Sequence, residues 1–78
     1  MPTMPKKSGT QLLNEHQNRG HTIEYEEYQC AGHSDNNPQY GCRVWVNGNP
    51  IGVANNKPSR RKAKEAAALE AAESLLLI

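Results

Sequence analysis

Apolar and polar side chains alternate most regularly in the middle of the chain, at residues 40–46. A period of two residues is the pattern of a strand that buries one of its two faces. Asn47 and Gly48 follow at once, and this pair favours a tight hairpin because both residues tolerate a positive φ. Residues 50–55 are therefore predicted to return as a neighbouring strand. The side chains expected on the buried face of the first strand are Tyr40, Cys42, Val44 and Val46.

An earlier strand is predicted at residues 22–30, TIEYEEYQC, because β-branched and aromatic residues are common in this run. The run ends at Ala31 and Gly32. Residues 33–39, HSDNNPQ, are polar or turn-forming, and we expect them to form the loop to the next strand.

A short helix is predicted before these strands, over residues 10–19. Gly20 then stands where a residue in the left-handed conformation commonly ends a helix. Because helical side chains three and four positions apart share a face, the helix has one side suited to packing. The residues on that side are Leu12, Leu13 and His16.

The last helix is predicted to start at Ser59, a favourable N-cap residue directly after Pro58. No glycine or proline interrupts the sequence after it, so we expect this helix to run to the end of the chain. Small alanine side chains on one side allow the helix to lie close to a sheet. That stripe consists of Ala63, Ala67, Ala71, Leu75 and Ile78, with Ala66, Ala68 and Ala72 beside it.

The order of these elements is helix, three antiparallel strands, helix. It predicts an α+β fold of the α-β-β-β-α type, with both helices packed on one face of a three-stranded sheet. A chain of 78 residues has room for one small domain. We assign residues 9–78 to this domain and residues 1–8, which offer little to bury, to a loose tail.

The composition indicates in which cellular compartment the protein is expected. No apolar run approaches the ~18 residues of a membrane-spanning helix, and the first residues lack the apolar stretch of a secretion signal. We therefore expect an intracellular protein without a membrane segment. In that reducing setting Cys30 and Cys42 are expected to be ordinary thiols.

The net charge is only +1, but the basic residues are concentrated near the start of the last helix. Cations are unfavourable at a helix N-terminus, where the dipole is positive. A bound phosphate reverses this, because it neutralises the cations and accepts hydrogen bonds from free backbone N–H groups. Helical spacing makes three of the bases converge on one side of the helix. The alternative to a phosphate-binding site is a solvated basic patch that only aids solubility. The five bases are Lys57, Arg60, Arg61, Lys62 and Lys64, of which Arg60, Arg61 and Lys64 converge.

Residues 51–76, IGVANNKPSRRKAKEAAALEAAESLL, closely resemble the C-terminal half of the double-stranded RNA-binding domain. The family pattern is a glycine, any residue, a glycine or alanine, and later a serine, two bases, any residue, Ala-Lys and an alanine-rich helix. The resemblance extends over residues 8–77, with LLNE at 12–15 and with Tyr25 and Gly32 at the family's spacing. The matching positions are Gly52, Ala54, Ser59, Arg60, Arg61, Ala63, Lys64, Ala67 and Ala68.

The resemblance implies a protein that reads the shape of duplex RNA, over ~16 base pairs. It assigns phosphate contacts to Arg60, Arg61 and Lys64. Lys57, the neighbouring base of the charge cluster, is expected to bind RNA as well. The resemblance assigns contacts with the 2′-hydroxyls and base edges of a minor groove to residues of the first helix. The alternative is that these residues form an ordinary solvated helix face. These residues are Asn14 and Glu15, with Ser8, Thr10 and Gln11 as neighbours in the same groove.

The loop GHSDNNPQY departs from the family's Gly-Pro-any-His pattern. His33 stands in place of the proline, and Asp35 stands near the expected histidine. The residues of this loop expected to reach a second minor groove are His33, Asn36 and Asn37, and a simple connector is the alternative.

Two further interpretations compete with RNA binding. Cys30, His33 and Cys42, with His16 or His21, have the chemistry of zinc ligands, but their spacing is not that of a zinc finger and Cys42 belongs to the core stripe. We therefore expect no metal and no cofactor. The second alternative is a domain of the same fold used for protein contact or dimerisation, through Leu69 and Leu76 on the outer side of the last helix and through the C-terminus.

An enzyme is the least favoured class. No nucleophile with a base, no inward pair of carboxylates and no phosphate-binding loop with a lysine is evident in the sequence. We therefore predict a binding domain without catalytic activity. The alternative includes a larger RNA-processing enzyme as the parent of this domain.

Overall fold

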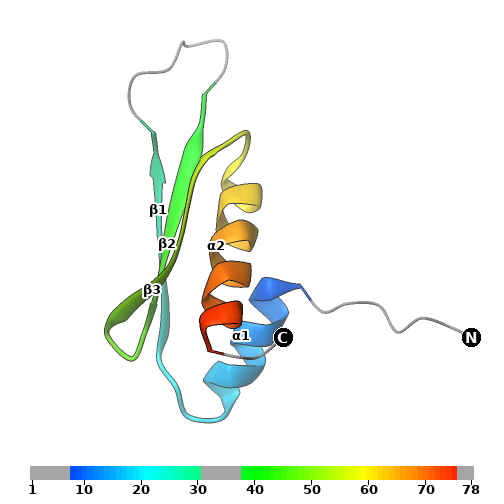
Figure 1. The fold of residues 1–78 in the computed structure, drawn as a ribbon, viewed down its shortest axis with the longest axis vertical. Helices are drawn as coiled ribbons and strands as arrows, with labels where there is room; N and C mark the ends of the chain where they lie inside the picture. The colour runs from blue at the N-terminus through cyan, green and yellow to red at the C-terminus, as the bar shows by residue number, and fades with distance from the viewer. Residues whose placement is uncertain (1–7, 31–37, 76–78) are drawn as a thin grey trace, which may run out of the picture.

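The computed structural model describes residues 8–30 and 38–75, and it confirms the predicted α-β-β-β-α order (Figure 1). The three strands form one antiparallel sheet in the order β1-β2-β3. Both helices lie on the same side of this sheet, as predicted (Figure 1). The elements are α1 (Gly9–Asn18), β1 (Ile23–Gln29), β2 (Tyr40–Val46), β3 (Asn49–Lys57) and α2 (Arg60–Ser74).

The central strand β2 supplies the sheet side of the core, as its alternating pattern predicted. Cys42, Val44 and Val46 are buried, and Tyr40 packs against them while partly exposed. Gly41, on the other face, is buried as well because the ring of Tyr28 in β1 lies across it. The two outer strands are linked over this glycine, since the Tyr28 hydroxyl donates a hydrogen bond to Asn55 Oδ1 in β3.

The turn between β2 and β3 has the conformation that its sequence predicted. Asn47 and Gly48 have φ values of 52° and 84°, which identify a type I′ hairpin. Strand β3 is longer than the predicted range of 50–55. It continues to Lys57 because Asn56 adopts a φ of 61°, a conformation that asparagine tolerates better than most residues, and because shifts of register accommodate the irregularity.

Helix α2 lies close to the sheet through its alanine stripe. Gly52 in β3 makes this approach possible, because an added side chain there would overlap the carbonyl oxygen of Ala67. Ser59 caps the helix by accepting a hydrogen bond from the Lys62 N–H at 3.1 Å. The alanines that α2 buries are Ala63, Ala67, Ala68, Ala71 and Ala72.

The prediction that the last helix runs to the chain end is wrong, because α2 ends at Ser74. Leu75 leaves the helical conformation, with φ −87° and ψ 0°, and its N–H bonds back to the carbonyls of Ala71 and Glu73. No basic side chain stands in the last turn to stabilise the negative end of the helix dipole. The end of the predicted stripe, Ile78, lies outside the described residues.

Helix α1 packs mainly on α2 and reaches the sheet at β1. Leu13 is fully buried in this contact, and Gly9 lies against the backbone of Ala68 and Leu69, where a side chain would not fit. Gly20 follows the helix with φ 103°, as predicted. Ser8, which the sequence analysis assigned to the loose tail, is the N-cap of α1 and so belongs to the folded part.

Neither helix in the described part of the chain is long and apolar enough to cross a membrane.

Candidate nucleic-acid interface

The start of α1 is held by a capping box. Ser8 Oγ accepts a hydrogen bond from the Gln11 N–H at 3.2 Å, and Gln11 Oε1 accepts one from the Ser8 N–H at 2.9 Å. The Ser8 and Thr10 hydroxyls also lie within hydrogen-bond distance, at 3.2 Å. Ser8 and Gln11, both predicted to contact RNA, therefore have a structural role as well.

A carboxylate of α2 ties this cap to the second helix. Glu65 Oε1 accepts a hydrogen bond from the Thr10 N–H at 3.1 Å, and Glu65 Oε2 accepts one from the Thr10 hydroxyl at 3.0 Å. The first four N–H groups of a helix have no partner within it, so Glu65 satisfies a donor that α1 cannot satisfy itself. These bonds bring the start of α1 beside the basic first turns of α2.

A groove of about 430 Å³ lies where the two helices meet. It brings together two sets of residues that the sequence analysis assigned to different RNA contacts, one from the start of α1 and one from the basic turns of α2. Its lining consists of Ser8, Thr10, Arg61, Lys64 and Glu65. The hydroxyls and cations of this groove are suited to phosphate and sugar oxygens.

Two tyrosines of the sheet support two of the bases. Lys64 Nζ lies 4.5 Å from the centroid of the Tyr25 ring, and Arg60 Cζ lies 5.4 Å from that of Tyr40. Both distances are within the range of cation–π attraction. Burial raises the pKa of the Tyr25 phenol, and electrostatic interactions with Cys42 and Glu65 raise it further, so the ring is neutral at neutral pH.

The three bases predicted to converge make different contacts. Arg61 and Lys64 share the groove, whereas Arg60 leans over Tyr40. Lys57 is paired with Tyr40 in the register of β2 and β3, so it lies on the side of Arg60. The basic surface thus extends from the groove beside α1 to the end of β3.

The remaining predicted contacts lie further along α1 or outside the described residues. Asn14 is exposed on α1, and Glu15 beside it is partly buried. His33 and Asn36 fall in the part of the loop that the structure does not describe, so their contacts stay predictions.

Among the described residues, no three His, Cys, Asp or Glu side chains gather as metal ligands do. Cys30 and Cys42 are free thiols. Burial raises the pKa of the Cys42 thiol, and the carboxylate of Glu27 raises it further, which disfavours the thiolate form that binds metals. The third proposed ligand, His33, lies outside the described residues.

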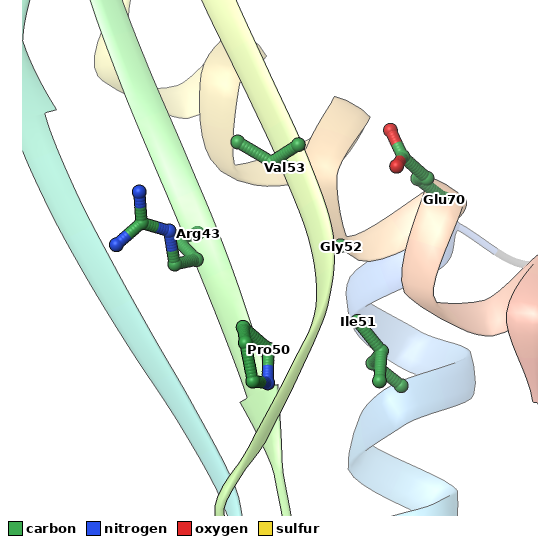
Figure 2. A pocket seen from close by; sticks show the side chains of 6 residues that line it. All are labelled: Arg43, Pro50, Ile51, Gly52, Val53 and Glu70. Carbon is green, nitrogen blue, oxygen red and sulfur yellow. The ribbon is translucent and has the colours of Figure 1, made fainter.

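A second hollow, of about 250 Å³, lies at the edge of the sheet. Figure 2 shows Arg43, Pro50 and Val53 on one side of the β3 ribbon and Ile51 on the other, with Glu70 on α2. Gly52 completes the lining. None of these residues is among those predicted to bind RNA.

Comparison with known families decides the identity of the domain. The sequence pattern of the double-stranded RNA binding motif matches residues 10–75. The chain belongs to this family. No curated protein and no solved structure matches the chain.

Membership confirms the resemblance drawn from residues 51–76 and the predicted fold. The double-stranded RNA binding motif binds duplex RNA, and it is a binding module rather than a catalyst. The groove between α1 and α2 therefore lies in a domain whose partner is double-stranded RNA.

Three residues of the site were not predicted as such. Tyr25 and Tyr40 were interpreted only as sheet residues, although a period of two placed Tyr40 on the face toward the helices. Glu65 carried no signal at all, because its partner Thr10 is 55 positions away. Only the packing of α1 on α2 brings these two residues together.

Proposed function

We propose that the domain binds duplex RNA by shape, with two elements that act together. Asn14, Glu15 and the start of α1 enter a minor groove, and the bases at the start of α2 bind the phosphates of the adjacent major groove. The observation that carries this proposal is the groove in which Thr10 of α1 stands beside Arg61 and Lys64 of α2.

The charges of the site support this division of roles. The start of α2 combines a positive dipole, backbone N–H groups that have no acceptor within the helix, and the exposed Arg60 and Arg61. No acidic side chain stands in its first turn. Phosphate oxygens neutralise this concentration of charge, so the unfavourable arrangement of the free protein becomes favourable in the complex.

The polar side chains of α1 support selection of RNA over DNA. Asn14 is exposed, and its amide both donates and accepts hydrogen bonds. A 2′-hydroxyl offers both a donor and an acceptor, and DNA lacks it. The wide, shallow minor groove of A-form RNA admits such a helix face.

Fluorescence anisotropy with a labelled RNA duplex of ~20 base pairs tests the proposal at two salt concentrations. We expect competition by unlabelled duplex RNA, little competition by DNA duplex or single-stranded RNA, and weaker binding at the higher salt concentration. Equal competition by all three nucleic acids would contradict shape reading. Absence of binding at low salt would contradict the proposed function as a whole.

The alternative of a protein-contact domain rests on one observation. Leu69 of α2 is 41% exposed, as the sequence predicted, while Leu76 lies outside the described residues. Analytical ultracentrifugation over a concentration series tests self-association directly. A monomer at the highest concentration would contradict dimerisation.

A further inference from the structure

We propose that Glu65 is a positioning residue for RNA binding, which sets α1 at the distance from α2 that both RNA contacts require. The inference rests on the function proposed above. Glu65 itself is not assigned a contact with RNA.

The carboxylate holds the start of α1 through both of its oxygens. The Thr10 N–H lies 3.1 Å from Oε1 and 3.4 Å from Oε2, and the Thr10 hydroxyl lies 3.0 Å from Oε2. Thr10 is the second residue of α1, where a negative charge is also favoured by the helix dipole. No acidic residue of the first turn of α1 supplies this charge, so it comes from α2.

A second contact at this end of α1 sets how closely the two helices approach. Gly9 touches the backbone of α2 at Ala68 and Leu69, where a side chain would not fit. The Glu65 bonds begin one residue later, on Thr10. Together with the packing of the buried Leu13, these two contacts define where α1 points, and so where Asn14 stands relative to Arg61 and Lys64.

Glu65 is electrostatically unfavourable for the ligand of this site. It lines the same groove as Arg61 and Lys64, where its charge reduces the attraction for phosphate. Its contribution to binding must therefore come from its hydrogen bonds. Substitutions that separate charge from hydrogen bonding test this distinction.

Two matched pairs make that separation. Glu65→Gln and Glu65→Ala remove the same charge, but only glutamine retains an oxygen that can accept the Thr10 N–H. Glu65→Asp keeps the negative charge of the unsubstituted domain (the parent in these experiments), but its carboxylate lies one methylene closer to the backbone. The aspartate variant is therefore compared with the parent. Because the second pair does not involve alanine, it decides the question if Glu65→Ala does not fold.

Hydrogen exchange of the Thr10 amide tests the structural step without RNA. This amide has no partner within α1, so its protection reports on Glu65 alone. We expect protection in the parent and in Glu65→Gln, and faster exchange in Glu65→Asp and Glu65→Ala. Equal exchange rates in all four proteins would overturn the assignment.

Binding to a ~20-base-pair RNA duplex tests the functional step. We expect Glu65→Ala to bind roughly three- to tenfold more weakly than Glu65→Gln, and Glu65→Asp more weakly than the parent. The dependence of affinity on salt should be equal within each pair, because the phosphate contacts of α2 remain.

Asn14→Ala in each background distinguishes positioning from general destabilisation. We expect this substitution to weaken binding in Glu65→Gln but to have little further effect in Glu65→Ala, where Asn14 is already displaced. Equal effects in both backgrounds would overturn the positioning role. If the unsubstituted domain does not bind the duplex, the proposed function itself fails, and that result is distinct from the others.

Discussion

The ammonium group of Lys64 lies 4.5 Å from the centroid of the Tyr25 ring. Lys64 comes from α2 and Tyr25 from β1, so the sheet supports a base that lines the groove between the helices. A lysine side chain loses substantial rotamer freedom when it is fixed by a ligand. Contact with the ring restricts the side chain before RNA arrives, which reduces that loss.

Tyr25→Leu should therefore weaken duplex RNA binding, by about two- to fivefold, because a cation–π contact of this kind contributes roughly 0.5–1 kcal/mol. Tyr25→Phe keeps the ring and should bind like the parent. Anisotropy titrations with both variants measure the difference, and thermal unfolding shows whether each is folded. Equal affinity of the two variants would show that the ring does not act on Lys64.

The lining of the groove predicts that the basic residues of α2 contribute unequally to RNA binding. Arg61→Ala and Lys64→Ala should each weaken binding equally for all duplex sequences and reduce the salt slope by about one unit. Lys62→Ala is the matched control, since Lys62 is exposed on α2 and is not part of the groove lining. Unchanged affinity in a triple alanine variant of Arg60, Arg61 and Lys64 would contradict the phosphate-binding role of the cluster.

Local patterns predicted the parts of the fold that depend on neighbours in sequence. The alternation over residues 40–46 identified the buried face of β2, and Asn47-Gly48 identified the type I′ turn. Both features are fixed by φ preferences and by side-chain direction, which a short stretch of sequence determines. The capping box of Ser8 and Gln11 also has a local signature, which the sequence analysis interpreted only as RNA contacts.

The tertiary part of the site could not be predicted in this way. The bonds between Glu65 and Thr10 and the contact between Arg60 and Tyr40 join elements far apart in the chain. Helical spacing placed Arg60 with Arg61 and Lys64, but it contains no information about the aromatic rings that Arg60 and Lys64 contact. The site therefore follows from packing as much as from sequence pattern.

The close approach of α2 to the sheet predicts intolerance to larger side chains. Ala67 is fully buried, and its carbonyl oxygen lies against Gly52. Ala67→Leu should reduce the free energy of unfolding by ~1–3 kcal/mol, because the helix must move to accommodate the added atoms. Ala66→Leu, at a partly exposed position of the same helix, should have a smaller effect. Urea unfolding of both variants measures the difference, and equal losses would contradict the close packing at Gly52.

A pair of stacked histidines joins the end of α1 to the start of β1. The rings of His16 and His21 have centroids 3.7 Å apart and planes inclined by 6°. His21 Nδ1 also lies 3.1 Å from the side-chain nitrogen of Asn47 in the hairpin turn. Burial lowers the pKa of His16 below its usual value of 6.5, and the positive charges of His21 and Arg19 lower it further.

This lowered pKa predicts a loss of stability in mild acid. The folded state disfavours the protonated form of His16, so the unfolded chain binds more protons. The contribution of neutral His16 to the free energy of unfolding is fully present above a pH of about 6.5. It is lost as the pH falls through the lower pKa that His16 has in the folded state. His16→Phe keeps a ring beside His21 and removes the titrating group, so its unfolding temperature should fall less between about pH 7.5 and about pH 5.5 than that of the parent. Equal decreases in the two proteins would assign the acid sensitivity to other groups, since a phenyl ring cannot bind a proton.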